Sequence, residues 1–329
     1  FLTDWNSMDD ARFLSELIQN KIRVRYAMKP FVMDGKTHQR GSLIITRADN
    51  KNKKTFLDVL AKTASKHNKI LTPTSTGFVE GGKDFGSSYV QMVPDVKVAV
   101  LTGEPTSTLQ FGEIWHFFEQ QLHYPVSIID GDYMNGVDFT EYDILVLPSG
   151  WGYKGFLNES RLKDLKKWVS DGGKLIAMGG SIKSLTGENG FKLKPREAKK
   201  DSSVTIQPYD ETERDRIKEA ITGAIFKTKV DTTHPLAFGY EDTYFSLKLG
   251  ADAYDYLDSG SVVYLEEGNT GPVSGFAGSE AQKKIAKTLV FGVENHGGGS
   301  VIYMVDNPLF RGFWENGKLF FANALFMVN

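Results

Sequence analysis

The stretch Lys174-Leu-Ile-Ala-Met178 runs directly into Gly179-Gly180-Ser181-Ile182. Its apolar residues predict a short buried strand, and the polar residues after the glycines can begin a helix. A strand, a tight turn and a helix in this order form a nucleophile elbow, whose strained turn exposes a reactive Cys or Ser and points backbone N–H groups at an oxyanion. Here glycines occupy the apex, and the chain contains no Cys. The sequence therefore predicts the scaffold of such a site without its nucleophile.

Apolar runs and amphipathic helices alternate on the N-terminal side of this stretch. The run 96–101 is followed by Gly103-Glu104-Pro105, and the run 143–147 by Pro148-Ser149-Gly150-Trp151. Helical spacing appears at 109–122 and at 157–169, and a further strand is expected at 126–129. Strands that are apolar throughout suit a parallel sheet covered on both faces. We therefore expect residues 94–329 to form a flavodoxin-like, doubly wound and mostly parallel α/β sheet.

Residues 1–90 are expected to form a separate, smaller α/β domain. Helical spacing follows Ser7, and Phe31-Val-Met with Gly41–Thr46 predicts a hairpin-like pair around the turn at Asp34-Gly35. In the C-terminal half, the glycines at 297–299 are expected to form a hairpin tip rather than a phosphate loop, because no Lys-Ser/Thr and no helix follow them. Residues 187–215 are charged and lack periodicity, which indicates an insertion or cover.

Composition excludes several classes of function. The net charge is −2 and no basic stripe is present, so nucleic acid and anionic membranes are not expected as partners. No apolar run approaches the roughly 20 residues that span a bilayer. The absence of Cys excludes disulfides and thiolate metal sites. Because the chain opens at Phe1 and leads at once into a helix, we expect it to be an interior or C-terminal part of a longer polypeptide.

Ligands of doubly wound sheets bind beyond the carboxyl ends of the strands. The residues that follow these ends are expected to cluster as a degenerate, non-catalytic crevice: Glu104, Ser149, Gly150, Trp151, Gly179, Gly180, Ser181 and Asn307. Gly179 and Gly180 could hold an oxyanion, although a packing turn is favoured. Ser181 lies beyond the apex without a paired His, which favours a helix N-cap over a nucleophile. Either Trp151 binds a ligand or, as we favour, Trp151 and Met178 fill a relic pocket.

Two of these segments resemble a known superfamily. Asp143-Ile-Leu-Val-Leu-Pro-Ser-Gly-Trp151 and Gly172-Gly-Lys-Leu-Ile-Ala-Met-Gly-Gly-Ser181 resemble the core of the class I glutamine amidotransferase-like proteins. The resemblance implies a Cys at the elbow, with a His and an acid after the last core strand. Gly179 stands at the position of the Cys. Asp306-Asn307-Pro308 resembles a degenerate His-Pro-Glu, with Asn307 at the position of the His.

A second resemblance covers nearly the whole chain and rests on a series of short motifs. These are Arg40-Gly-Ser-Leu-Ile-Ile-Thr-Arg47, Gly82-Lys-Asp-Phe-Gly-Ser87, His234-Pro-Leu-Ala-Phe-Gly239, Val273-Ser-Gly-Phe276 and Gly299–Trp314. They resemble the region that follows the catalytic domain in large bacterial, Bacteroidetes-like zinc carboxypeptidases. The resemblance implies an exported protein (periplasmic, outer-membrane-associated or extracellular) whose zinc domain lies upstream.

On that basis we expect a non-catalytic accessory region without a cofactor of its own. It would pack on its own upstream peptidase domain or bind peptide substrate. The alternative is a stand-alone small-molecule-binding or hydrolase domain that uses the strand-end crevice.

Two side-chain sets require a comparison of alternatives. His116-Phe-Phe-Glu119, with the distant His234, has the spacing of a zinc motif. Its position inside a helix favours an ordinary pair of side chains one turn apart, so no metal is expected in this chain. Arg311 with Trp314 could clamp a carboxylate, or the Arg could pack on an aromatic ring and anchor the last helix.

Overall fold

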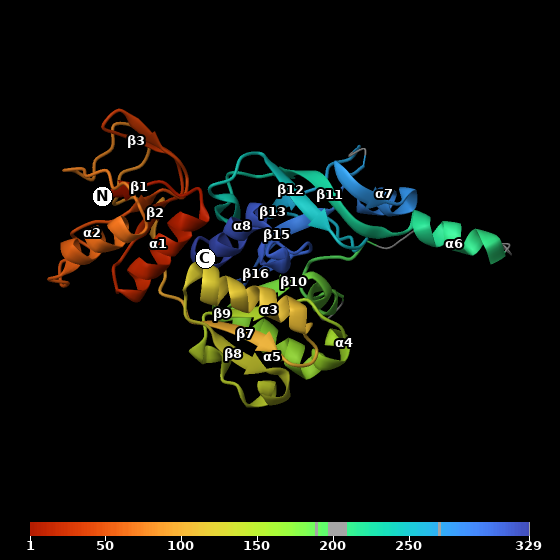
Figure 1. Ribbon diagram of the computed structural model, residues 1–329. Helices are drawn as coiled ribbons and strands as arrows, with labels where there is room; N and C mark the ends of the chain where they lie inside the picture. The colour runs from red at the N-terminus through yellow and green to blue at the C-terminus, as the bar shows by residue number, and fades with distance from the viewer. Residues whose placement is uncertain (188–189, 197–208, 269–270, 329) are drawn as a thin grey trace.

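A parallel half-sheet lies at the centre of the protein. The computed structural model describes residues 1–187, 190–196, 209–268 and 271–328 (Figure 1). Five strands pair in parallel in the order β8-β7-β9-β10-β16. Their bounds are β7 (Val98–Thr102), β8 (Ser127–Asp130), β9 (Ile144–Leu147), β10 (Lys174–Met178) and β16 (Gly299–Met304). In chain order this is the 2-1-3-4-5 arrangement of flavodoxin-like sheets, which confirms the predicted doubly wound fold.

Helices cover both faces of this half-sheet (Figure 1). One face packs against α3 (Thr108–His116), its π-helical continuation η1 (Phe117–Leu122) and the closing helix α8 (Glu315–Phe326). The other face packs against α5 (Glu159–Ser170). Successive side chains of a strand point to opposite faces, so Ile144 and Val146 contact the first layer while Leu145 and Leu147 contact the second. This double burial explains why the run 143–147 is apolar without alternation.

Antiparallel strands extend the sheet beyond β16. The hairpin of β15 (Leu289–His296) and β16 turns at the predicted glycines, with His296 opposite Gly299. The sheet then continues through β13 (Ser261–Tyr264), β11 (Ile221–Val230) and β12 (Thr243–Lys248), and β14 (Ser274–Ala277) pairs with β11. The strands β11 and β12 were not foreseen. Of the expected insertion at 187–215, the segments 188–189 and 197–208 lie outside the described residues; α6 (Tyr209–Lys218) is helical.

The N-terminal segment forms a sheet of its own, in the order β1-β5-β2-β6. Its elements are β1 (Leu2–Thr3), α1 (Met8–Gln19), β2 (Arg25–Ala27), β3 (Phe31–Met33), β4 (Lys36–His38), β5 (Leu43–Ile44), α2 (Phe56–Lys66) and β6 (Val90–Met92). The hairpin prediction was wrong in its second strand. β3 pairs with β4 across the turn at Asp34-Gly35, whereas β5 pairs with β1 and β2. The shorter connection wins because it closes a tight two-residue loop.

The remaining short elements connect these layers. They are α4 (Tyr153–Phe156), α7 (Ser279–Ile285), and the 3-10 turns η2 (Gly131–Gly136), η3 (Phe139–Glu141), η4 (Gly179–Leu185), η5 (Pro235–Ala237) and η6 (Phe310–Gly312). Within the described residues, no helix is long and apolar enough to cross a membrane.

The two sheets share one hydrophobic core, which is continuous from α1 to α8. Trp5 Nε1 donates to Asn323 Oδ1 at 2.7 Å, and the Tyr26 hydroxyl donates to the Met327 carbonyl at 2.9 Å. The boundary near residue 90 therefore separates two sheets but not two cores. Whether residues 1–90 fold as an independent domain stays a prediction.

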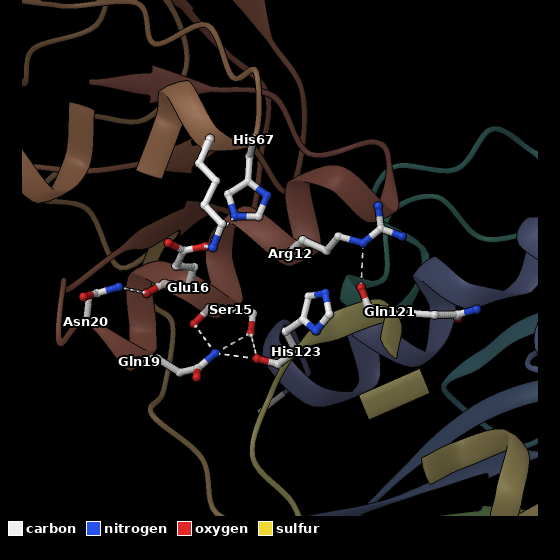
Figure 2. A network of polar contacts seen from close by, with 9 residues as sticks. Arg12, Ser15, Glu16, Gln19, Asn20, His67, Gln121 and His123 are labelled. Atoms are coloured by element: carbon white, nitrogen blue, oxygen red, sulfur yellow. Dashed lines mark hydrogen bonds and ion pairs between the residues drawn. The ribbon is translucent and has the colours of Figure 1, made fainter. Parts of the chain in front are cut away.

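Side chains of α1 also bind the end of η1 (Figure 2). Arg12 Nε donates to the Gln121 carbonyl at 2.6 Å, and Gln19 Nε2 donates to the His123 carbonyl at 2.5 Å. The last carbonyls of a helix lack partners within it. Polar side chains of α1 supply those partners here. These hydrogen bonds add to the apolar packing between the two sheets and fix how α1 lies against η1.

Candidate functional site

A crevice of about 190 Å³ lies beyond the carboxyl ends of the parallel strands. Four of the predicted residues line it: Ser149, Gly179, Gly180 and Asn307. The other lining residues are Gln110, Met178, Leu247, Leu249, Gly250, Asp252, Val305 and Asp306. The parallel sheet brings the first set together as expected. The stretch from Leu247 to Asp252 belongs to the antiparallel extension, and no local pattern had placed it here.

The side chain of Ser149 packs against the glycines of the elbow. Gly179 has φ 50°, a left-handed conformation that favours glycine. A Cβ atom on Gly179 would lie 2.7 Å from Ser149 Oγ and 3.0 Å from Ser149 Cβ. The same Ser149 hydroxyl accepts a hydrogen bond from the Gly180 N–H at 2.9 Å. Ser149 therefore occupies the space into which a nucleophile would project, and it takes up an N–H group of the turn.

Ser181 is part of the turn and not a reactive group. Its side chain is fully buried. The hydroxyl accepts from the Met178 N–H at 3.1 Å and donates to the Met178 carbonyl at 2.9 Å. The capping role favoured from sequence is present in an altered form. Met178, not Ser181, occupies the N-cap position of η4, and the Ser181 hydroxyl binds the backbone of Met178.

The loops after β7 and β9 adjoin one another, as predicted. Thr106 and Gly150 form a β-bridge, and the Trp151 N–H donates to the Pro105 carbonyl at 3.0 Å. A Cβ on Gly150 would lie only 2.1 Å from that same carbonyl oxygen, so the close approach requires glycine. Glu104 and Gly150 nevertheless do not line the crevice.

Trp151 does not fill the crevice, contrary to the relic interpretation. Its side chain is 83% exposed, whereas Met178 is 1% exposed and forms part of the crevice wall. The tight pairing of the two loops turns residue 151 outward. The prediction was therefore wrong for Trp151, and an open crevice remains beside the elbow.

Asn307 stands where the resemblance places a His, and it is fully engaged. Its Nδ2 donates to Glu113 Oε2 at 2.5 Å and to Gln110 Oε1 at 3.0 Å. Its Oδ1 accepts from the Leu309 N–H at 2.9 Å. Burial raises the pKa of the Glu113 carboxyl. Asn307 thus fastens the loop after β16 to α3, and its amide has no basic nitrogen with which to take up a proton.

Asp306, one of the lining residues, belongs to a buried ion pair. Lys248 Nζ donates to Asp306 Oδ1 at 2.9 Å, and Ser246 Oγ donates to Asp306 Oδ2 at 2.6 Å. The side chains of Lys248 and Asp306 are 1% and 7% exposed. Sequence analysis missed this group. The signal was the placement of Ser246 and Lys248 two residues apart, on one face of a strand that was not recognised.

The zinc-like motif does not assemble. Among the described residues, no three His, Asp or Glu side chains gather closely enough to hold a metal, and this includes His116, Glu119 and His234. His234 Nδ1 accepts from the Leu236 N–H at 3.1 Å, and burial lowers the pKa of His234 to about 4. His234 is therefore a neutral cap of η5.

Arg311 and Trp314 do not form a carboxylate clamp either. The Arg311 guanidinium lies over the ring of Phe310, 5.2 Å from its centre. Trp314 Nε1 donates to the Tyr244 hydroxyl at 3.2 Å. Both residues make contacts in the segment that precedes α8. The predicted packing of Arg311 on an aromatic ring is present, but the ring is that of Phe310 and not of Trp314.

No protein-family model matches the sequence, and no curated protein is detectably similar to it. Solved structures with a similar course of the chain include a putative GMP synthase subunit from Thermoplasma acidophilum, at 10% identity over 70% of this chain and 92% of that one, with a TM-score of 0.43. A glutamine amidotransferase from Thermotoga maritima matches at 12% identity over 65% and 76%, with a TM-score of 0.36.

A β-galactosidase from Bacillus circulans sp. alkalophilus is also similar, at 12% identity over 70% of this chain but only 30% of that one, with a TM-score of 0.35. These likenesses are weak and bear on fold alone. The fold assignment above rests on the strand order and on the placement of the helices.

Proposed function

We propose that this chain is a non-catalytic accessory region of an exported bacterial zinc metallocarboxypeptidase-family protein. Its strand-end crevice binds part of the peptide substrate, and its outer surface packs on the upstream peptidase domain. The family assignment rests on the sequence resemblance. The absence of catalysis rests on one observation, the contact between Ser149 Oγ and the space in front of Gly179.

Amide hydrolysis by this type of fold requires a nucleophile and a base. Gly179 supplies no nucleophile, and the Ser149 side chain crowds the space that one would enter. Asn307 supplies no base, and its amide is held by Glu113 and Gln110. The same geometry leaves the crevice open, which supports binding without turnover.

The walls of the crevice suit an uncharged or weakly cationic side chain. Apolar atoms come from Met178, Leu247, Leu249 and Val305. The carboxylate of Asp306 is neutralised by Lys248. Asp252 is exposed, and no basic side chain of the described residues lines the crevice. A volume of about 190 Å³ suits a single side chain or a small molecule, not a folded partner.

The zinc that the family implies does not fit this chain. The described residues offer no set of three metal-binding side chains, so no step of the chemistry is assigned to them. In this proposal the metal belongs to the upstream domain. The present chain would contribute by holding substrate or by supporting that domain.

The test compares peptidase activity of the full-length protein with and without residues 1–329, on long and short peptides. A finer version blocks the crevice by Gly250→Phe. Gly250 lines the crevice, and a Cβ there would meet no atom within 4 Å. Gly155→Phe is the matched control, because its Cβ is equally free and it lies outside the crevice.

We expect the deletion and Gly250→Phe to raise KM for long peptides several-fold, with little change for short ones and none for Gly155→Phe. Kinetic constants unchanged by the deletion would contradict an accessory role. Glutaminase or amidase activity in the isolated chain would contradict the proposal that it is non-catalytic.

A further inference from the structure

A second cavity, of about 550 Å³, opens at the junction of the two sheets. Three segments line it: residues 4–6, residues 36–42 and residues 232–241. Among the described residues it shares no lining residue with the strand-end crevice. This junction groove is thus a separate feature, formed only because the N-terminal sheet is docked on the main one.

Two left-handed glycines fix the walls of the junction groove. A Cβ on Gly41, which has φ 85°, would lie 3.0 Å from both Trp5 Cδ1 and Phe238 Cβ. A Cβ on Gly239, also at φ 85°, would lie 2.7 Å from Leu319 Cδ2 and 2.9 Å from the Trp5 carbonyl oxygen. The backbone therefore packs too closely for any side chain at either position. Both glycines hold the segments beside the groove in close contact with Trp5.

Two polar side chains in this groove lack partners. Arg40 is partly buried, and no hydrogen bond or ion pair engages its guanidinium within the described part of the chain. Ser42 is only 1% exposed, and its hydroxyl likewise makes no hydrogen bond to the described residues. Both side chains are presented by the turn that Gly41 locks in place.

We propose that the junction groove is a binding site for a carboxylate. A guanidinium offers two parallel N–H groups that match the two oxygens of a carboxylate. The Ser42 hydroxyl lines the same groove and can supply a third donor. The site lies outside the proposed peptide-binding crevice and does not depend on that proposal.

The charges of the lining argue against a dianion. Lys36 Nζ lies 3.3 Å from Asp4 Oδ2, so these two charges offset one another. The remaining charged side chains are Arg40 and the exposed Glu241. The four formal charges sum to zero, so the groove has no excess positive charge to hold a dianion such as phosphate. A carboxylate on an otherwise neutral or cationic molecule fits best.

N-acetylglycine, its amide N-acetylglycinamide and inorganic phosphate are the three probes, titrated into the whole chain by ligand-observed NMR or calorimetry. We expect the acid to bind at least ten-fold more tightly than either of the others. Arg40→Gln should abolish this preference, and Ser42→Ala should weaken binding several-fold. Arg47→Gln is the matched control on an exposed Arg of the same unit, and it should bind as the unchanged protein does.

Arg40→Lys keeps the charge but not the paired N–H groups, so it should bind at least several-fold more weakly while retaining the fold. Thermal unfolding of each variant separates lost binding from lost structure. Acetyl-diglycine, with a terminal carboxylate, and the α-amide of N-acetylglutamic acid, with a side-chain carboxylate, distinguish the two sources of the group. Equal binding of acid and amide, tighter binding of phosphate, or full binding by Arg40→Gln would each overturn the proposal.

Discussion

Ser149 Oγ lies 2.7 Å from the position that a Cβ atom on Gly179 would occupy. The Ser149 side chain therefore crowds the position at which the resemblance places a nucleophile. The same hydroxyl accepts a hydrogen bond from the Gly180 N–H. A thiol introduced at Gly179 alone would have to share this space with the Ser149 side chain.

The first prediction concerns Gly179→Cys. This change should destabilise the protein by about 1–3 kcal/mol, because it puts a non-glycine residue at positive φ and against Ser149. Adding Ser149→Gly should recover part of that loss, since it removes the atoms that clash. Chemical denaturation of the single and double variants gives the free energies of unfolding.

The reactivity of the introduced thiol measures how accessible position 179 is, because the chain has no other Cys. Iodoacetamide should label it faster in the double variant than in the single one. Ser160→Cys, on the exposed surface of α5, serves as the control and should be labelled quickly without loss of stability. A Gly179→Cys protein as stable as the unchanged one would refute this account of the elbow.

The second prediction contrasts two tryptophans. Trp151 is 83% exposed, so Trp151→Ala should change the free energy of unfolding by no more than about 0.5 kcal/mol. Trp168 is 8% exposed and packs in the core beneath α5, so Trp168→Ala should cost about 3–5 kcal/mol. Urea denaturation followed by circular dichroism measures both. A large loss for Trp151→Ala would restore the relic interpretation of the crevice.

The parallel half of the fold was predictable because its strands carry a continuous signal. In β9 and β10 every residue is buried, and the turns that follow contain glycine or proline. The strands β11 and β12 escaped notice because their polar residues interrupt the pattern. Lys248 and Ser246 face inward there, and only the long-range contact with Asp306 explains why they can.

The candidate site divides in the same way. Ser149, Gly179, Gly180 and Asn307 follow successive parallel strands, so topology alone predicts that they meet. The outward position of Trp151 could not be foreseen, because it depends on the hydrogen bond between its N–H and the Pro105 carbonyl. The position of Arg40 in the junction groove could not be predicted either, because it depends on the docking of two sheets.

The third prediction is a pH dependence caused by Lys174. Its ammonium is buried against the end of α8, with Nζ 3.1 Å from the Ala324 carbonyl and 3.2 Å from that of Leu325. Burial lowers the pKa of Lys174 to about 7 in the folded protein, below the ordinary value near 10.4. Between these values the unfolded chain binds more protons than the folded one, so stability rises with pH.

The slope from this group should reach at most about 1.4 kcal/mol per pH unit between pH 7 and 9, and its contribution is lost as the pH falls through 7. Lys174→Met keeps the length of the side chain and should flatten that part of the profile. Lys167→Met, at an exposed position on α5, is the control and should leave the slope unchanged. Parallel profiles for the Lys174→Met and unchanged proteins would argue against a lowered pKa.

The last prediction is a coupling between Lys248 and Asp306. Their side chains form an ion pair of 2.9 Å with almost no exposure to solvent. Removing one charge leaves the other buried without a partner, so Lys248→Met or Asp306→Asn alone should cost about 3–5 kcal/mol. The double variant removes both charges and should cost clearly less than the sum of the two single losses, which a double-mutant cycle of unfolding free energies measures.

Ser246→Ala, which removes a neutral donor to Asp306, is the control for this coupling and should cost only about 1–3 kcal/mol. Additive losses would show that the two charges act independently, and the pair would then not be what holds Asp306 in place beside the crevice.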